Sequence, residues 1–140
     1  MTMKSLNAID PTPEQIKAFL GESSPDKPVY MLNLLKFKEH ATYKDGEAVS
    51  GETAYGRYAD AFSKMLKDLN IEGTETVFSG KAKHSLIGSG DWDAVAIVRY
   101  PNAQTMFNTV SSESYRKIHY HRKAGLEGQL LISCETSGLF

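Results

Sequence analysis

The sequence is poor in several features that would define its class. It has one cysteine, Cys134, so no internal disulfide can form and a reducing, cytoplasmic environment is expected. No apolar run approaches the roughly 18 residues that span a bilayer, and Asp10 and Pro11 interrupt any apolar signal core near the N-terminus. The formal net charge is −1 without a basic block, which argues against a nucleic-acid partner. These absences predict a soluble protein that binds neither membranes nor nucleic acid.

Familiar catalytic motifs are also missing. The chain has no serine or cysteine nucleophile motif, no dinucleotide fingerprint and no convincing carboxylate pair. Its sheet strands lack the paired basic and aromatic residues of an RNA-recognition surface. We therefore expect no cofactor, and any chemistry has to come from scattered polar residues in apolar surroundings.

What is present is the composition of one globular domain, with 140 residues of which 41% are apolar and 24% charged. Residues 1–27 read as an N-terminal extension with one short helix, opened by a capping box from Thr12 to Gln15. Residues 28–140 are expected to form the main domain.

The main domain shows alternating strand and helix patterns. Residues 55, 58, 62, 65 and 69 have the spacing of an amphipathic helix. The resulting order is β-α-β-β-α-β, an α+β, ferredoxin-like fold with a four-stranded antiparallel sheet and both helices on one face. The expected elements are a strand at 28–37, a helix at 52–70, strands at 74–88 and 93–100, helical pieces at 102–110 and 111–122, and a strand at 127–135.

The first strand is apolar on both of its faces. Val29, Met31 and Leu35 lie on one alternation, and Leu32 and Leu34 lie on the other. Because the helices can cover only one face of the sheet, the other face needs a partner, and a second copy of the chain is the economical solution. The sequence therefore predicts a homodimer that packs sheet against sheet.

Four stretches together resemble the family named domain of unknown function 1330 (DUF1330). They are MLNLLKF, AYGRY, DWDAVAIVRYP and YRKIHYHRKAGLEGQLLI, and the resemblance covers about residues 28–136. The resemblance implies a dimeric α/β barrel with a small-molecule pocket between each sheet and its own helices. Relatives in the dimeric α/β-barrel superfamily include cofactor-free monooxygenases, haem-degrading oxygenases and muconolactone isomerases. The family itself has no agreed reaction, so function by this route is analogy.

The motif HYH, at His119 and His121, suggests a metal site or an acid/base pair. The surrounding pattern predicts a helix, on which these two side chains diverge by roughly 200°. His119 then shares the inward side with Tyr115 and Arg122, and no Cys, Asp or Glu completes a metal site. A histidine near a helix C-terminus can also simply interact with the helix dipole. We favour that reading for His121. For His119 and Arg122 it stands beside a second reading, in which their helical face looks toward the pocket.

Three further polar residues interrupt apolar strands. Asn33 should bridge neighbouring strands or offer a donor to a ligand. Arg99 could pair with an acid at the dimer contact, bind an anionic group or lie at the surface. His84 is either a core histidine or, if it lines the pocket, the best general base.

The remaining candidates are Tyr55, Tyr58 and Tyr115, which could line the pocket or belong to the core. We weigh two functions. One is a cofactor-independent enzyme of the oxygenase or isomerase type, with His84 or His119 as base, Arg122 as the oxyanion or carboxylate partner, and Asn33 and the tyrosines as positioning groups. The other is a non-catalytic ligand-binding or regulatory homodimer.

Overall fold

The computed structural model describes residues 8–138, so the start of the predicted N-terminal extension and the last two residues of the main domain lie outside the described part. The strands pair antiparallel in the order β2-β3-β1-β4, which confirms the predicted ferredoxin-like sheet. The elements are α2 (Pro13–Glu22), β1 (Val29–Phe37), α3 (Gly51–Asp68), β2 (Glu75–Lys81), β3 (Ala94–Tyr100), α4 (Ala103–Val110), α5 (Glu113–Arg116), α6 (His119–Gly125) and β4 (Leu126–Cys134).

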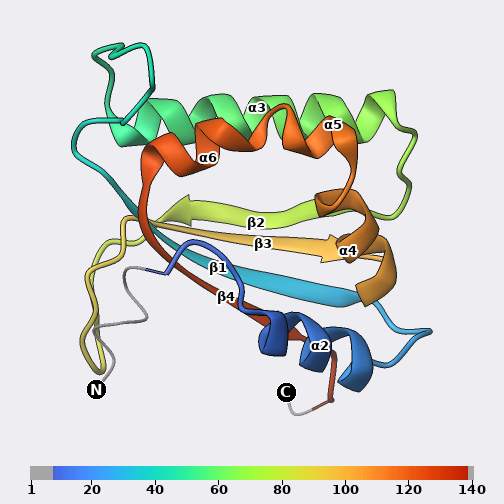
Figure 1. Ribbon diagram of the computed structural model, residues 1–140. Helices are drawn as coiled ribbons and strands as arrows, with labels where there is room; N and C mark the ends of the chain where they lie inside the picture. Colours follow the sequence, from blue (N-terminus) through green and yellow to red (C-terminus); the bar gives the residue numbers. More distant parts are fainter. Residues whose placement is uncertain (1–7, 139–140) are drawn as a thin grey trace.

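The helices α3, α5 and α6 lie across one face of the sheet (Figure 1). The core fills the space between these two layers, where Val29, Leu35 and Leu126 are fully buried. Within residues 8–138, no helix combines the length and the apolarity needed to cross a bilayer.

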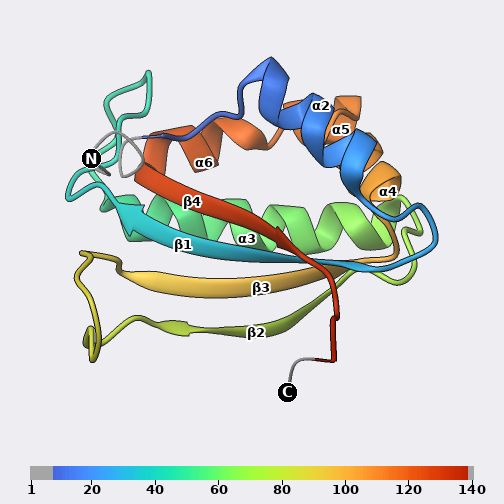
Figure 2. The ribbon, with the colours of Figure 1, turned by 90° about the horizontal axis from the view of Figure 1, so that it is seen from below.

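We call the opposite face the outer face; none of the described helices crosses it, and it is turned toward the viewer in Figure 2. The pairing register places Leu32 of β1 between Ile97 of β3 and Ile132 of β4 on this face. Phe78 of β2 pairs with Ile97 and is 57% exposed, and Ile132 is 47% exposed. The single chain therefore leaves an apolar sheet face uncovered, as the double alternation of β1 predicts.

Two glycines allow α3 and α6 to meet closely at the end of β1. The Lys38 N–H donates to the Gly125 carbonyl over 2.8 Å, and the Gly51 N–H donates to the Lys38 carbonyl over 3.0 Å. A Cβ on Gly51 would overlap the Lys38 carbonyl oxygen, and a Cβ on Gly125 would lie 2.5 Å from the Gly51 oxygen. Neither position has room for a side chain.

The strand predicted over residues 74–88 is shorter than expected and ends at Lys81. Its last pair with β3 joins Lys81 to Ala94, and the Ala82 N–H makes one further bond, to the Asp93 carbonyl over 3.0 Å. Asp93 also donates its N–H to the Leu35 carbonyl of β1 over 2.8 Å. An irregularity in the pairing of β2 lies between Thr76 and Phe78.

The helix predicted over residues 111–122 forms two pieces, α5 and α6. The Ser112 hydroxyl caps α5 by accepting from the Tyr115 N–H at 3.1 Å. The break follows because the Ile118 N–H bonds only three residues back, to the Tyr115 carbonyl, which tightens the turn.

The N-terminal helix α2 begins with the predicted capping box. The Thr12 hydroxyl accepts from the Gln15 N–H over 3.1 Å, and the Gln15 side chain accepts from the Thr12 N–H over 2.9 Å. α2 lies at the β4 edge of the sheet (Figure 2), and its residues Phe19 and Leu20 pack against the core. The division between an extension at 1–27 and a main domain at 28–140 stays a prediction.

Candidate functional site

A cavity of about 940 Å³ lies on the helical side of the sheet, between the strands, the helices and the N-terminal segment. Its volume falls within the roughly 300–1,000 Å³ that small-molecule sites occupy. Met31 and Leu131 line it from the sheet, Met106 and Phe107 from α4, and Phe19 from α2. The walls are therefore mainly apolar, and the polar groups among them carry the chemical information.

Four tyrosines line the cavity: Tyr55 and Tyr58 from α3, Tyr100 from β3 and Tyr115 from α5. Residues three apart share a helix face, so α3 presents its two tyrosines together. The hydroxyls of Tyr58 and Tyr115 are 2.9 Å apart. Burial raises the pKa of Tyr55 to about 12, and it also raises the pKa values of Tyr58 and Tyr100. These phenols stay protonated at neutral pH and can donate hydrogen bonds to a ligand.

A hydrogen-bonded row crosses the floor of the cavity from α6 to β3. Asn33 Nδ2 donates to the carbonyls of Met31, over 3.1 Å, and Ala96, over 3.2 Å. Its Oδ1 accepts from Gln129 Nε2 at 2.7 Å, and Gln129 Oε1 accepts from Arg122 Nη2, also at 2.7 Å. The predicted strand-bridging role of Asn33 is thus confirmed, and Asn33 lines the cavity as well.

The N-terminal segment closes the cavity beside Arg122. The Ala8 carbonyl accepts from the Gln129 N–H over 2.8 Å, and the Ile9 carbonyl accepts from Arg122 Nη2. Asp10 lies 3.8 Å from Arg122 Nη1 and 3.4 Å from Lys123 Nζ. A segment outside the predicted main domain therefore contributes part of the cavity wall.

His119 faces the same cavity from the first turn of α6. The centroid of its imidazole ring lies 5.8 Å from the centroid of the Tyr115 ring. Burial, followed by the charges of Lys123 and Arg122, lowers the pKa of His119, and Asp10 offsets this in part. A neutral imidazole at pH 7 can accept a proton, which is the protonation state a general base requires.

Two candidates from the sequence lie outside the cavity. His84 falls in the exposed loop after β2, because that strand ends at Lys81. Arg99 pairs with Tyr30 across the sheet on the outer face, where its guanidinium donates to the Gly73 carbonyl over 2.8 Å. By contrast, the structure brings together Asn33, Tyr55, Tyr58, Tyr115, His119 and Arg122.

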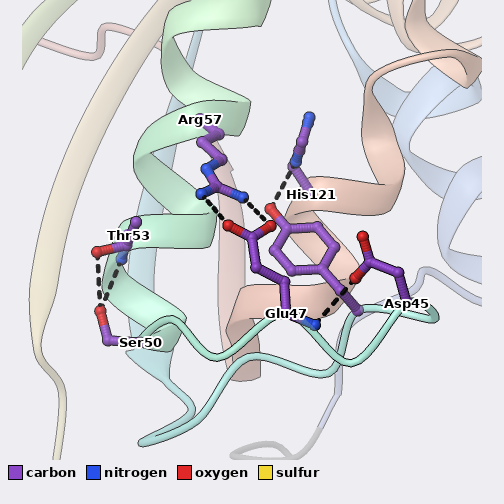
Figure 3. Close-up of polar contacts among 7 residues, drawn as sticks. Asp45, Glu47, Ser50, Thr53, Arg57 and His121 are labelled. Atoms are coloured by element: carbon purple, nitrogen blue, oxygen red, sulfur yellow. Dashed lines mark hydrogen bonds and ion pairs between the residues drawn. The ribbon is translucent and has the colours of Figure 1, made fainter.

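His121 points away from His119, as the helix interpretation predicts, and belongs to a separate cluster. Its Nδ1 lies 2.6 Å from the Tyr43 hydroxyl. Nearby, Arg57 of α3 forms a bidentate pair with Glu47, at 2.9 and 2.7 Å (Figure 3). These contacts attach loop 39–50 to α3 and α6, and no residue of this loop lines the cavity described above.

The pKa values of Glu47 and His121 are both shifted in this cluster, and Arg57 contributes to both shifts. The hydrogen bond from Arg57 lowers the pKa of the exposed Glu47 carboxyl. Burial, and then the Arg57 charge, lowers the pKa of His121. Among residues 8–138, no three His, Cys, Asp or Glu side chains are grouped so that they could hold a metal ion.

Sequence reasoning missed three groups at the cavity. Gln129 carries the same signal as Asn33, a lone amide among apolar strand residues, and could have been found by the same argument. Tyr100 is the last residue of an apolar strand and looks like ordinary core. Asp10 could not be found, because only the tertiary fold brings the N-terminal segment to Arg122.

The fold defines a ferredoxin-like α+β protein, with a cavity between its sheet and helices. The chain belongs to the family described as domain of unknown function (DUF1330), whose model matches residues 46–134. No curated protein matches it.

Solved structures agree with this assignment. The methylated RPA0582 protein has 29% identity and a TM-score of 0.84, covering 96% of this chain and 98% of that chain. RPA0582 of Rhodopseudomonas palustris, a protein of unknown function, has 29% identity and a TM-score of 0.82, covering 94% and 98%. A dimeric protein of unknown function with a ferredoxin-like fold, from Bacteroides fragilis, has 9% identity and a TM-score of 0.53, covering 78% and 96%.

Proposed function

We propose that this protein binds a small organic molecule in the cavity between the sheet and the helices. The observation that carries the proposal is a mainly apolar cavity of about 940 Å³ into which a few polar groups converge. Ligand sites typically combine these two properties, since apolar walls supply affinity and sparse polar groups set orientation. Protonated tyrosines and the Arg122–Gln129–Asn33 row would supply that orientation here.

Thermal-shift screening of small aromatic compounds tests the proposal. A compound present at about 100 times its dissociation constant stabilises the folded state by about 2.7 kcal/mol. Ser133 lines the cavity from β4, so the indole of Ser133→Trp should obstruct part of it and weaken the response. Ser79 of β2 is exposed and does not line the cavity, so Ser79→Trp is the matched control. Hits that respond equally to both variants would contradict the assignment.

A second candidate function is proton transfer within the same cavity. The lowered pKa of His119 favours it, because a neutral imidazole can remove a proton from an acidic C–H or phenol of the ligand. The electron pair left behind would move onto a ligand oxygen facing Arg122. Such a step requires no oxidant and would begin either an isomerisation or an oxygenation.

Exchange of ligand hydrogen for deuterium separates catalysis from simple binding. In D₂O, the wild-type protein should label the acidic position of a bound compound, as followed by NMR. His119→Gln should bind the same compound in the thermal-shift assay without labelling it. A bound compound that stays unlabelled in the wild type would support a non-catalytic ligand-binding or regulatory protein instead.

The assembly is proposed to be a homodimer in which two outer faces pack together. Support comes from the apolar residues exposed there, among them Phe78 and Ile132, and from the dimeric Bacteroides fragilis protein that shares the fold. A closed two-fold pair would cover the outer face on both copies at once.

A further inference from the structure

Arg122 is held by neutral partners and keeps hydrogen-bonding capacity toward the cavity. Its side chain is only 13% exposed. Both hydrogen bonds that it makes to described residues use Nη2, with the Ile9 carbonyl and with Gln129 Oε1. Its Nη1 faces Asp10 at 3.8 Å, which is an ion pair but too long for a hydrogen bond. A guanidinium has five N–H donors, so Arg122 still has donors available for a further planar partner.

The charge around Arg122 is not balanced. Asp10 is shared between two cations, Arg122 and Lys123, and is itself 54% exposed. The lowered pKa of His119, caused in part by those two cations, reflects the same positive surroundings. The other carboxylates that line the cavity belong to its far end: Glu22 ends α2, and Glu135 is bonded to Ser24. The Arg122 end of the cavity therefore holds two cations that share one carboxylate.

We infer that the ligand of this cavity is a small organic carboxylate, whose carboxylate binds Arg122 Nη1 in competition with Asp10. The inference rests on the proposed function, since it names the ligand class of the same cavity. Arg–carboxylate pairs are short and often bidentate, which the present contact with Asp10 is not. The aromatic walls and the tyrosine hydroxyls then hold the uncharged part of the molecule.

Asp10 acts in this scheme as an internal substitute for the ligand. It belongs to the N-terminal segment, just before the Thr12 cap of α2, so a bound carboxylate would displace that side chain without unfolding the helix. Removing its charge should therefore favour carboxylate ligands, because their competitor and a repelling charge are lost together. A residue that merely supported the site would have the opposite effect.

Calorimetric titration with 2-naphthoate and 2-naphthamide tests the inference, because the two probes share a ring system and differ in charge. The full chain should bind the naphthoate about tenfold or more tightly than the naphthamide at low salt. Arg122→Gln should remove this preference, so that the two probes bind about equally. Asp10→Asn should strengthen naphthoate binding several-fold, whereas Glu14→Gln, in the first turn of α2, should not.

The outcomes separate this inference from the proposed function. Equal binding of both probes, or weaker naphthoate binding by Asp10→Asn, would overturn the carboxylate assignment while the cavity remained a ligand site. Failure of every compound in the thermal-shift screen would overturn the proposed function itself. If Arg122→Gln does not fold, the Asp10→Asn and Glu14→Gln pair still decides the matter.

Discussion

Arg122, Gln129 and Asn33 form a row in which each donor fixes the next acceptor. Because Asn33 Nδ2 donates to two carbonyls, its Oδ1 must accept, and Gln129 must present its NH₂ to Asn33 and its oxygen to Arg122. The hydrogen bonds between neighbouring members hold this row in one arrangement. The cavity floor is thus organised before any ligand arrives.

Acidification is expected to weaken the attachment of loop 39–50. Burial, and then Arg57, hold the pKa of His121 below its ordinary value of 6.5 in the folded protein. The unfolded chain therefore binds a proton first, and the free energy of unfolding decreases as the pH falls through 6.5 toward the folded pKa. Denaturant unfolding should show lower stability at about pH 5.5 than at about pH 7.5.

His121→Gln should reduce this pH dependence, because glutamine keeps an acceptor for Tyr43 but does not titrate. His119, whose pKa is also lowered, contributes in the same direction. His40→Gln is the matched control, since the His40 side chain is 87% exposed. An identical pH dependence in the wild type and in His121→Gln would contradict this account.

The role of a single polar residue was predictable from the sequence where its apolar neighbours require it to be hydrogen-bonded. Asn33 shares its strand face with the buried Met31 and Leu35, and an amide partly buried beside them was expected to be bonded. Arg99 was not resolved, because both faces of its strand are apolar and the alternation alone does not say which face the helices cover. The structure places it on the outer face.

At the scale of elements, the contact between α3 and α6 depends on the absence of side chains at Gly51 and Gly125. Gly51→Ala or Gly125→Ala should destabilise the protein by about 1–3 kcal/mol or more, because a Cβ would meet backbone atoms that cannot move aside. Denaturant unfolding of the two variants measures this directly.

Gly56→Ala is the control within the same helix. A Cβ at Gly56 meets nothing within 4 Å, so the substitution should stabilise the protein by about 1 kcal/mol through helix propensity. If Gly51→Ala were also neutral or stabilising, the close approach of the two helices would not be a structural requirement.

The elements themselves were largely predictable, since amphipathic spacing and capping residues are local signals. The strand at 74–88 was overextended because alternation continues through Ala82, His84 and Leu86. Pairing needs a partner as well as a pattern, and the paired residues of β2 and β3 end at Lys81 and Ala94. The presence of a facing strand is a tertiary effect that no local window contains.

At the scale of the whole molecule, the outer face predicts a stable dimer at micromolar concentrations. Ile132→Glu places a charge on this face and should shift sedimentation toward the single chain, because a buried, unpaired carboxylate is costly. Leu69→Glu changes a comparably exposed leucine, 42% exposed at the end of α3, and should leave the dimer intact. A wild-type protein that sediments as a folded single chain would contradict the dimer.

The fold and family were predictable from sequence because the order of elements and four separate motifs agree. The cavity was expected only in outline. Its wall from residues 8–22 arises from long-range contacts, such as that between Ala8 and Gln129, which carry no sequence pattern.

The central claim, that the space between sheet and helices is the functional site, is tested most directly by a crystal structure of the protein soaked with a thermal-shift hit. We expect the compound to lie among Tyr58, Tyr115 and His119, with its polar group toward Arg122. Density for the compound on the outer face, with an empty cavity, would contradict the claim.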